Sequence, residues 1–180
     1  GVAAVLCEGG LAYRAGVAFM GVGAHTVEAC MDGEPIEGSP FSVYVAPSAP
    51  FLENFNISGA GLSRCVAGEA AAFTVQAADI YGNLIRKGGA RLSLVASVAD
   101  VRSQGRLADN SNGTYEGQYT VDTAGEVNLV ITLDTGGSQY TKRFRAVCCA
   151  ARTSPARCVV EESPARHPGA GAWGCILIRR

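Results

Sequence analysis

Apolar and polar residues alternate along most of the chain between residues 51 and 147. The clearest alternating runs are 73–78, 91–96, 115–121, 126–133 and 140–147. A period of two puts the apolar side chains on one face of an extended strand, whereas a helix repeats every three to four residues. Strands of a parallel sheet are covered on both faces and are continuously apolar. The alternation therefore predicts antiparallel strands and disfavours a doubly wound fold.

Clusters of turn-forming residues separate these runs. They are 79–83, 87–89, 109–113, 123–125 and 135–137, each containing Gly, Asn or Asp. With two weaker runs at 55–58 and 101–107, the count is about seven strands in about 100 residues, which is typical of an immunoglobulin-like sandwich. No segment has a convincing helical period. We therefore predict an all-β fold, an immunoglobulin-like antiparallel β-sandwich.

The first 46 residues repeat the end of this pattern. The segment 11–14 matches the strand that begins at Tyr115, and 23–27 matches 125–129. The offset between the matching segments is about 102 residues, which is the size of one sandwich domain of this class. We expect 1–46 to be the C-terminal part of an incomplete repeat. Residues 47–50, with Pro at both ends, form a linker, and 51–148 form a nearly complete repeat. The tail 149–180 is rich in Arg and Pro and is expected to be disordered or non-native.

The charge balance excludes some classes of partner. The net charge is −1, from 15 basic and 16 acidic residues, so no positive excess is present to neutralise phosphates or anionic lipid. No apolar run approaches the ~20 residues that span a bilayer. We expect neither nucleic-acid binding nor membrane insertion.

Residues able to do chemistry are scarce. The two histidines, His25 and His167, leave little for a Ser-His-Asp or Cys-His system, and no nucleophile-elbow or phosphate-loop motif occurs. We predict no enzymatic activity and no cofactor. The seven cysteines include no Cys-x-x-Cys pair, and aligning Gly113 with the invariant Gly of a calcium loop puts Ala108 at its first ligand, so no metal site is expected. The odd cysteine count favours free thiols and a reducing compartment.

Two short motifs bring in the family resemblance. The segment 33–41, Gly-Glu-Pro-Ile-Glu-Gly-Ser-Pro-Phe, resembles the closing signature of the filamin-type immunoglobulin-like repeat. Asp109 with 112–115 and 124–126 resembles its central signature. The similarity extends over roughly 11–147. The second repeat lacks the Pro and Gly-Ser-Pro-Phe elements near 137–141, so its final strand is expected to be frayed or differently registered.

The resemblance implies a structural and scaffolding module in a chain of tandem filamin-like repeats, acting as a spacer and protein-binding rod. Such repeats occur in actin cross-linking proteins of the cytoskeleton, and any actin contact would lie elsewhere in the parent protein. This implies a cytoplasmic, cytoskeletal location. The alternative is an extracellular or cell-surface adhesion protein built from the same repeats, and the glycosylation sequons at Asn56 and Asn112 fit that alternative.

The resemblance also implies where a protein partner would bind. Partners of such repeats bind by β-strand addition along the third strand, where main-chain hydrogen bonds supply affinity. In this chain we expect that strand to be a sheet edge formed by Arg91, Leu92, Ser93, Leu94, Val95, Ala96 and Ser97.

Overall fold

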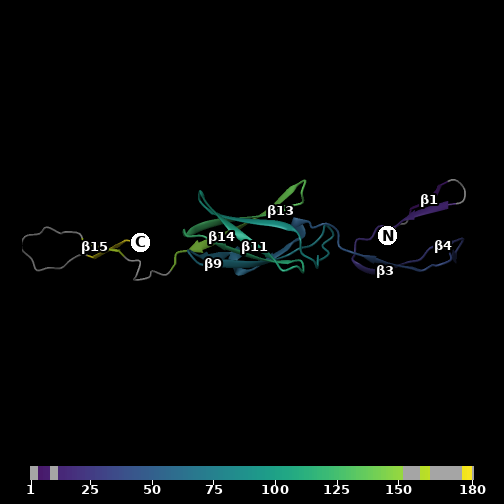
Figure 1. Ribbon diagram of the computed structural model, residues 1–180, viewed down its shortest axis with the longest axis horizontal. Helices are drawn as coiled ribbons and strands as arrows, with labels where there is room; N and C mark the ends of the chain where they lie inside the picture. The colour runs from purple at the N-terminus through teal and green to yellow at the C-terminus, as the bar shows by residue number, and fades with distance from the viewer. Residues whose placement is uncertain (1–3, 9–11, 152–158, 163–175, 180) are drawn as a thin grey trace, which may run out of the picture.

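The computed structural model describes residues 4–8, 12–151, 159–162 and 176–179. Its central body is a sandwich of strands, with the N-terminal segment at one end and β15 beyond the other (Figure 1). The strands of the sandwich are β7 (Asn56–Ser58), β8 (Arg64–Val66), β9 (Ala70–Gln76), β10 (Arg91–Val98), β11 (Val101–Asp109), β12 (Thr114–Thr120), β13 (Gly125–Asp134) and β14 (Gln139–Cys149).

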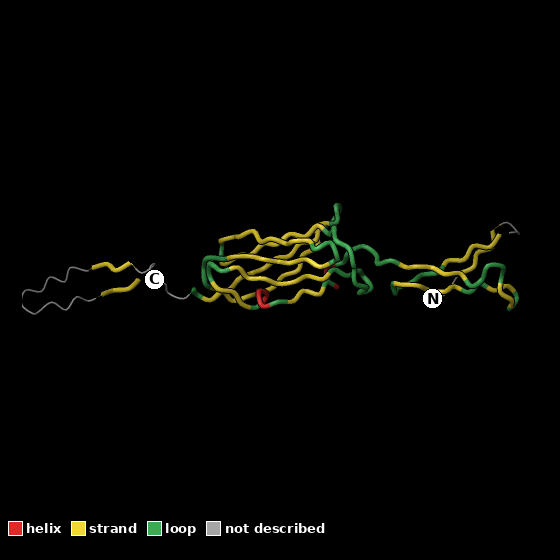
Figure 2. Tube along the Cα trace, turned by 60° about the horizontal axis from the view of Figure 1, so that its bottom comes forward, coloured by secondary structure: helices red, strands yellow, loops and turns green. Residues whose placement is uncertain are grey.

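The strands follow one another in the order β7-β9-β12-β11-β10-β13-β14-β8. All neighbours are antiparallel except β14 and β8, which are parallel. The described residues of the sandwich include only two short 3-10 helices, η1 (Leu52–Asn54) and η2 (Ala60–Leu62), and strands dominate the trace (Figure 2). The predicted all-β, immunoglobulin-like sandwich is confirmed. No helix in the described part of the chain is long and apolar enough to cross a membrane.

The alternation found in the sequence becomes burial in the structure. Along β13, Val127, Leu129, Ile131 and Leu133 are at most 1% exposed, while their neighbours face outward. Tyr115 and Tyr119 of β12 add buried aromatic surface, and the alternation of β12 places both on the inner face. Phe73 and Val75 of β9 are buried on the inner face in the same way. This burial of apolar surface is the main term that stabilises the sandwich.

The residues that connect β11 to β12 form a turn, as the sequence predicts. Gly113 has a φ of +84°, and a Cβ there would lie 1.8 Å from the carbonyl oxygen of Ile85. Only glycine fits both constraints. The side-chain oxygen of Asn112 accepts a hydrogen bond from the backbone N–H of Thr114 at 2.9 Å. This segment is a tight turn rather than a calcium loop.

Among the described residues, four further strand pairs lie outside the sandwich. They are β1 (Ala4–Glu8) with β2 (Ala12–Gly16), β3 (Gly23–Val27) with β6 (Phe41–Val45), β4 (Cys30–Met31) with β5 (Glu34–Pro35), and β15 (Val159–Glu162) with β16 (Ile176–Arg179). The last pair falls in the segment predicted to be a disordered or non-native tail. The rest of that segment beyond Ala151 lies outside the described residues.

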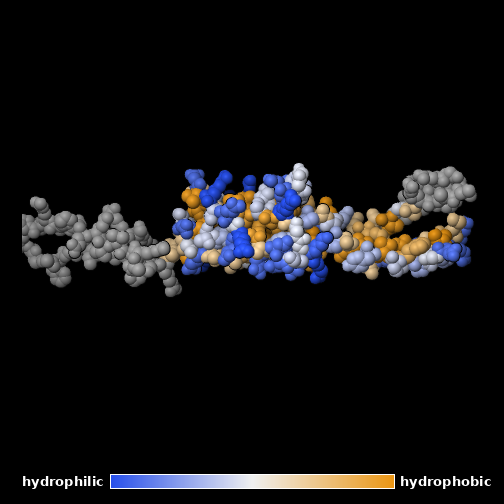
Figure 3. Space-filling model, in the orientation of Figure 1, coloured by the Kyte–Doolittle hydropathy of each residue, from blue (hydrophilic) through white to orange (hydrophobic). Residues whose placement is uncertain are grey.

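Side chains of residues 15–46 contribute nothing to the buried core. Apolar groups there remain open to solvent, with Met20 at 69% and Tyr44 at 79% exposure. Figure 3 shows hydrophobic surface along this segment next to the more polar sandwich. A two-stranded hairpin such as β3–β6 has too little area to bury an apolar face by itself.

Candidate functional site

The segment predicted as a peptide-binding edge, 91–97, forms most of β10. Alternation of its side chains is as expected, with Leu94 and Ala96 buried and Arg91 and Ser93 exposed. Its position in the sheet differs from the expectation. β10 pairs with β13 along Arg91–Val98 and with β11 over Leu94–Val98. The prediction of a free edge is therefore wrong for residues 94–97.

β11 lies beside β10 because the connection between the two strands is short. Only Ala99 and Asp100 separate β10 from β11, and Ala99 has a φ of +48°. A two-residue hairpin turn with positive φ holds the next strand directly beside the one before it. The weak alternation of 101–107 indicates a strand but not which strands lie beside it.

The pairing between β10 and β11 stops at Leu94 and Gly105. From Arg106 to Asp109, β11 pairs with β12 instead, so this one strand joins the two halves of the sandwich. A Cβ on Gly105 would lie 2.4 Å from Cδ2 of Leu94, so the glycine makes room for a core leucine where the two strands separate.

Hydrogen-bond directions identify which backbone groups face the separation. The N–H of Thr135, just after β13, donates to the carbonyl of Ser138 at 3.0 Å. Because the direction of the backbone N–H and C=O groups alternates along a strand, those of the odd-numbered residues of β13 face β14 and those of the even-numbered residues face β10. The register then turns the N–H and C=O of Leu92 toward β11. Similarly, the N–H of Asn110 donates to the carbonyl of Thr114 at 3.1 Å, which turns the backbone of Leu107 toward β10. The main-chain groups of Leu92 and Leu107 thus face each other beyond the end of the β10–β11 ladder. We call this place the strand gap.

Two side chains bind the main chain just before the strand gap. The N–H of Gly89 donates to Oδ2 of Asp109 at 2.7 Å, and the N–H of Ala90 donates to the hydroxyl oxygen of Tyr115 at 3.0 Å. Burial raises the pKa of Tyr115, so its hydroxyl stays protonated and neutral. These contacts fix the start of β10 but leave the main chain of Leu92 available.

Beyond β13 the sheet continues to β14 and ends at the short β8, so the outer side of β14 is an edge only before Val147, and it is partly covered. The N–H of Val147 donates to the carbonyl of Ser63 at 2.9 Å beside the parallel β8, and Nζ of Lys142 donates to the carbonyl of Glu53 at 3.0 Å. Arg145 pairs with Glu126 at 3.4 Å on the exposed surface. Cationic side chains on an edge strand discourage pairing with another chain. The final strand is not frayed, because β14 pairs with β13 from Gln139 to Cys148.

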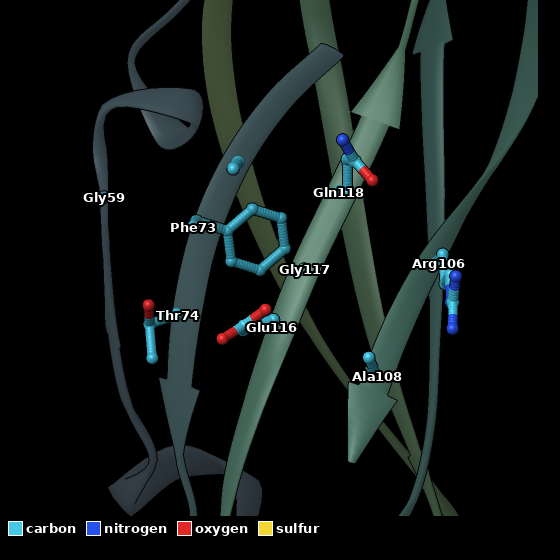
Figure 4. Close-up of a pocket in the computed structure, with 9 residues that line it drawn as sticks. Gly59, Phe73, Thr74, Arg106, Ala108, Glu116, Gly117 and Gln118 are labelled. Atoms are coloured by element: carbon cyan, nitrogen blue, oxygen red, sulfur yellow. The ribbon is translucent and has the colours of Figure 1, made fainter. Parts of the chain in front are cut away.

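A shallow hollow of about 500 Å³ lies over β9, β11 and β12 (Figure 4). Its polar side chains are Thr74, Arg106, Glu116 and Gln118, which come from the three strands. The lining residues include one carboxylate and one guanidinium but neither His nor Cys.

Comparison with curated proteins finds partial matches. Tripartite motif-containing protein 2 of Homo sapiens is 35% identical over 77 residues, which is 42% of this chain and 10% of that protein. Tripartite motif-containing protein 3 of Mus musculus is 38% identical over the same shares. The matched part of the chain thus spans about a tenth of the length of these relatives.

Solved structures and a family model give the remaining comparisons. The Lin-41 filamin domain is 18% identical with a TM-score of 0.42, covering 55% of this chain and 97% of that domain. The Escherichia coli adhesin FdeC is 20% identical with a TM-score of 0.54, covering 83% of this chain and 46% of that structure, and this likeness concerns the fold alone. The Filamin/ABP280 repeat model matches residues 49–140, just over half of the chain. The chain therefore belongs to the Filamin/ABP280 repeat family.

Proposed function

We propose that this repeat is a spacer that also binds an extended peptide of a partner protein by strand addition to β10. The observation that supports the proposal is the strand gap. There the backbone N–H and C=O of Leu92 face β11 without a ladder partner, because β11 has already moved away to pair with β12. Unpaired main-chain groups of a strand are what an added strand binds.

A peptide would begin at Leu92 and extend along β10 by replacing the first half of β11. The pairs it would replace are those from Leu94–Gly105 to Val98–Val101. One antiparallel ladder is exchanged for another, so hydrogen bonds are conserved and the net affinity depends on side chains. An apolar side chain of the peptide beside half-buried Leu92 and a polar one beside exposed Ser93 would suit the alternation of β10.

A display library of random twelve-residue peptides, selected on the full chain, tests this proposal. We expect the enriched peptides to alternate apolar and polar residues. Leu92→Pro removes the N–H that faces the strand gap and should weaken binding at least tenfold, about 1.4 kcal/mol.

The matched control is Arg102→Pro. The N–H of Arg102 lies in β11 and, by the alternation of that strand, faces away from β10. Binding should be unchanged in this variant. Equal binding by the wild type and a folded Leu92→Pro variant would show that the peptide attaches elsewhere.

We further propose that the parent protein lies in the cytoplasm and joins the actin cytoskeleton through other parts of its chain. The thiols of Cys30, Cys65, Cys148 and Cys149 are free among the described residues, which suits a reducing compartment. An N-linked glycan on Asn56 or Asn112 in protein isolated from its source would contradict this location and favour the adhesion alternative.

A further inference from the structure

Two buried cysteines lie side by side at one end of the sandwich. Cys65 of β8 and Cys148 of β14 are register partners in the parallel pair that joins the first and last parts of the repeat. They are 6% and 3% exposed. They are 83 positions apart in sequence, and nothing in their spacing predicted that they would meet.

The geometry of neighbouring strands suits a bond between them. On either side of the pair, Arg64 and Val147 are exposed, so alternation turns both cysteine side chains inward to the same face. Adjacent strands are about 4.8 Å apart, within the roughly 4.4–6.8 Å between the Cα atoms of disulfide-bonded cysteines. The two thiols thus meet the main distance requirement without a change of fold.

A tyrosine hydroxyl completes a small polar cluster inside the otherwise apolar core. The hydroxyl of Tyr119 donates to the carbonyl of Gly61 in η2, the short helix that precedes β8. Burial, followed by the neighbouring Cys65, raises the pKa of Tyr119 and raises that of Cys148 to about 11. The hydroxyl of Tyr119 and the thiol of Cys148 are therefore neutral at physiological pH.

We propose that Cys65 and Cys148 form a reversible disulfide when the protein meets a peroxide oxidant. One thiol attacks hydrogen peroxide and becomes a sulfenic acid, with release of one water. The second thiol then attacks the sulfenic sulfur, the S–S bond forms, and a second water leaves. Two thiols lose two electrons in total, and one peroxide is reduced to two waters.

The place of the pair at the ends of its strands gives the oxidant a route. β8 has only three residues and β14 ends one residue after Cys148. Strand ends open locally far more often than a whole domain unfolds. Because the neutral, buried thiol of Cys148 reacts slowly, the reaction rate should follow this local opening.

Peptide mapping of the full chain after treatment with hydrogen peroxide tests the proposal. Trypsin leaves Cys148 and Cys149 on one peptide, 146–152, so the exposed Cys149 is replaced by serine to make the assignment unique. In Cys149→Ser we expect a peptide pair joined through Cys65 and Cys148 with the loss of two hydrogens. Dithiothreitol should separate it.

Thermal unfolding supplies the second measurement. Because the bond would close a long loop, the melting temperature should rise by more than about 5 °C on oxidation and return on reduction. Cys148→Ala, which keeps Cys149, should show neither the link nor the rise. A link that persists in Cys148→Ala, or sulfinic acid at these positions of Cys149→Ser without a link, would overturn the proposal.

Discussion

At the scale of single residues, Asp79 joins the linker to the repeat. Its carboxylate is 1% exposed and accepts hydrogen bonds from the N–H of Ser48 at 3.0 Å, of Tyr81 at 2.9 Å and of Asn83 at 2.9 Å. The side-chain amide of Asn83 adds a fourth at 3.0 Å. The sequence predicted a turn at 79–83, but burial of this carboxylate depends on a linker residue 31 positions away.

Replacement of Asp79 should be costly. Asp79→Ala would leave several backbone donors without their acceptor, and we expect the free energy of unfolding to fall by about 3 kcal/mol. Urea denaturation measures this loss. Glu53→Ala, which removes an exposed carboxylate outside this network, is the control and should change stability by less than about 0.5 kcal/mol. Similar losses in both variants would contradict the assigned role of Asp79.

The same carboxylate gives a pH dependence with a definite sign. Burial alone would raise the pKa of Asp79, but the hydrogen bonds from Asn83, Ser48 and Tyr81 outweigh it and hold the pKa below 3.8. Its stabilising contribution is therefore complete above the unfolded-state pKa and is lost as the pH falls below it. In urea denaturation, the stability difference between wild type and Asp79→Ala should stay constant from pH 7 to about 5 and shrink below about 4.

At the scale of elements, strand identity and phase could be predicted because alternation is a local property. The neighbours of β10 could not, because pairing joins distant segments and is decided by the turn at Ala99 and by the crossing of β11. The strand gap, the only free part of the predicted edge, depends on that crossing. The contacts that cover β14, from β8 and from Glu53, likewise could not be predicted from the sequence of β14 itself.

The close packing of β9 against β12 gives a test at this scale. Gly117 lies opposite Phe73, and a Cβ on the glycine would lie 2.4 Å from the phenyl ring. Gly117→Ala should lower the free energy of unfolding by about 1–3 kcal/mol, because the ring has to leave its place in the core. Chemical denaturation measures the change.

Gly137 provides the matched control, since a Cβ there meets nothing within 4 Å. Gly137→Ala should be close to neutral. If the two alanine variants unfold at the same denaturant concentration, the packing of Phe73 against β12 is not as tight as the structure indicates.

At the scale of the molecule, we expect the main repeat to fold by itself. Every buried hydrophobic side chain of the described residues lies between Leu52 and Cys148. We expect residues 49–149, expressed alone, to unfold in one cooperative calorimetric transition within a few degrees of the main transition of the full chain. Residues 12–46 alone should show no such transition. Loss of cooperativity in the fragment 49–149 would mean that the flanking segments belong to the same folding unit.

The parallel pairing of β8 with β14 decides how the repeat would respond to a pull applied at its two ends. The linker lies ahead of β8 and the chain leaves after β14, so such a pull would draw these two strands in opposite directions along their length. They have to slide past each other, which loads the hydrogen bonds of Ser63, Val147, Ala67 and Cys149 together rather than one after another. A domain whose terminal strands are loaded in shear resists extension far better than one whose strands separate one hydrogen bond at a time.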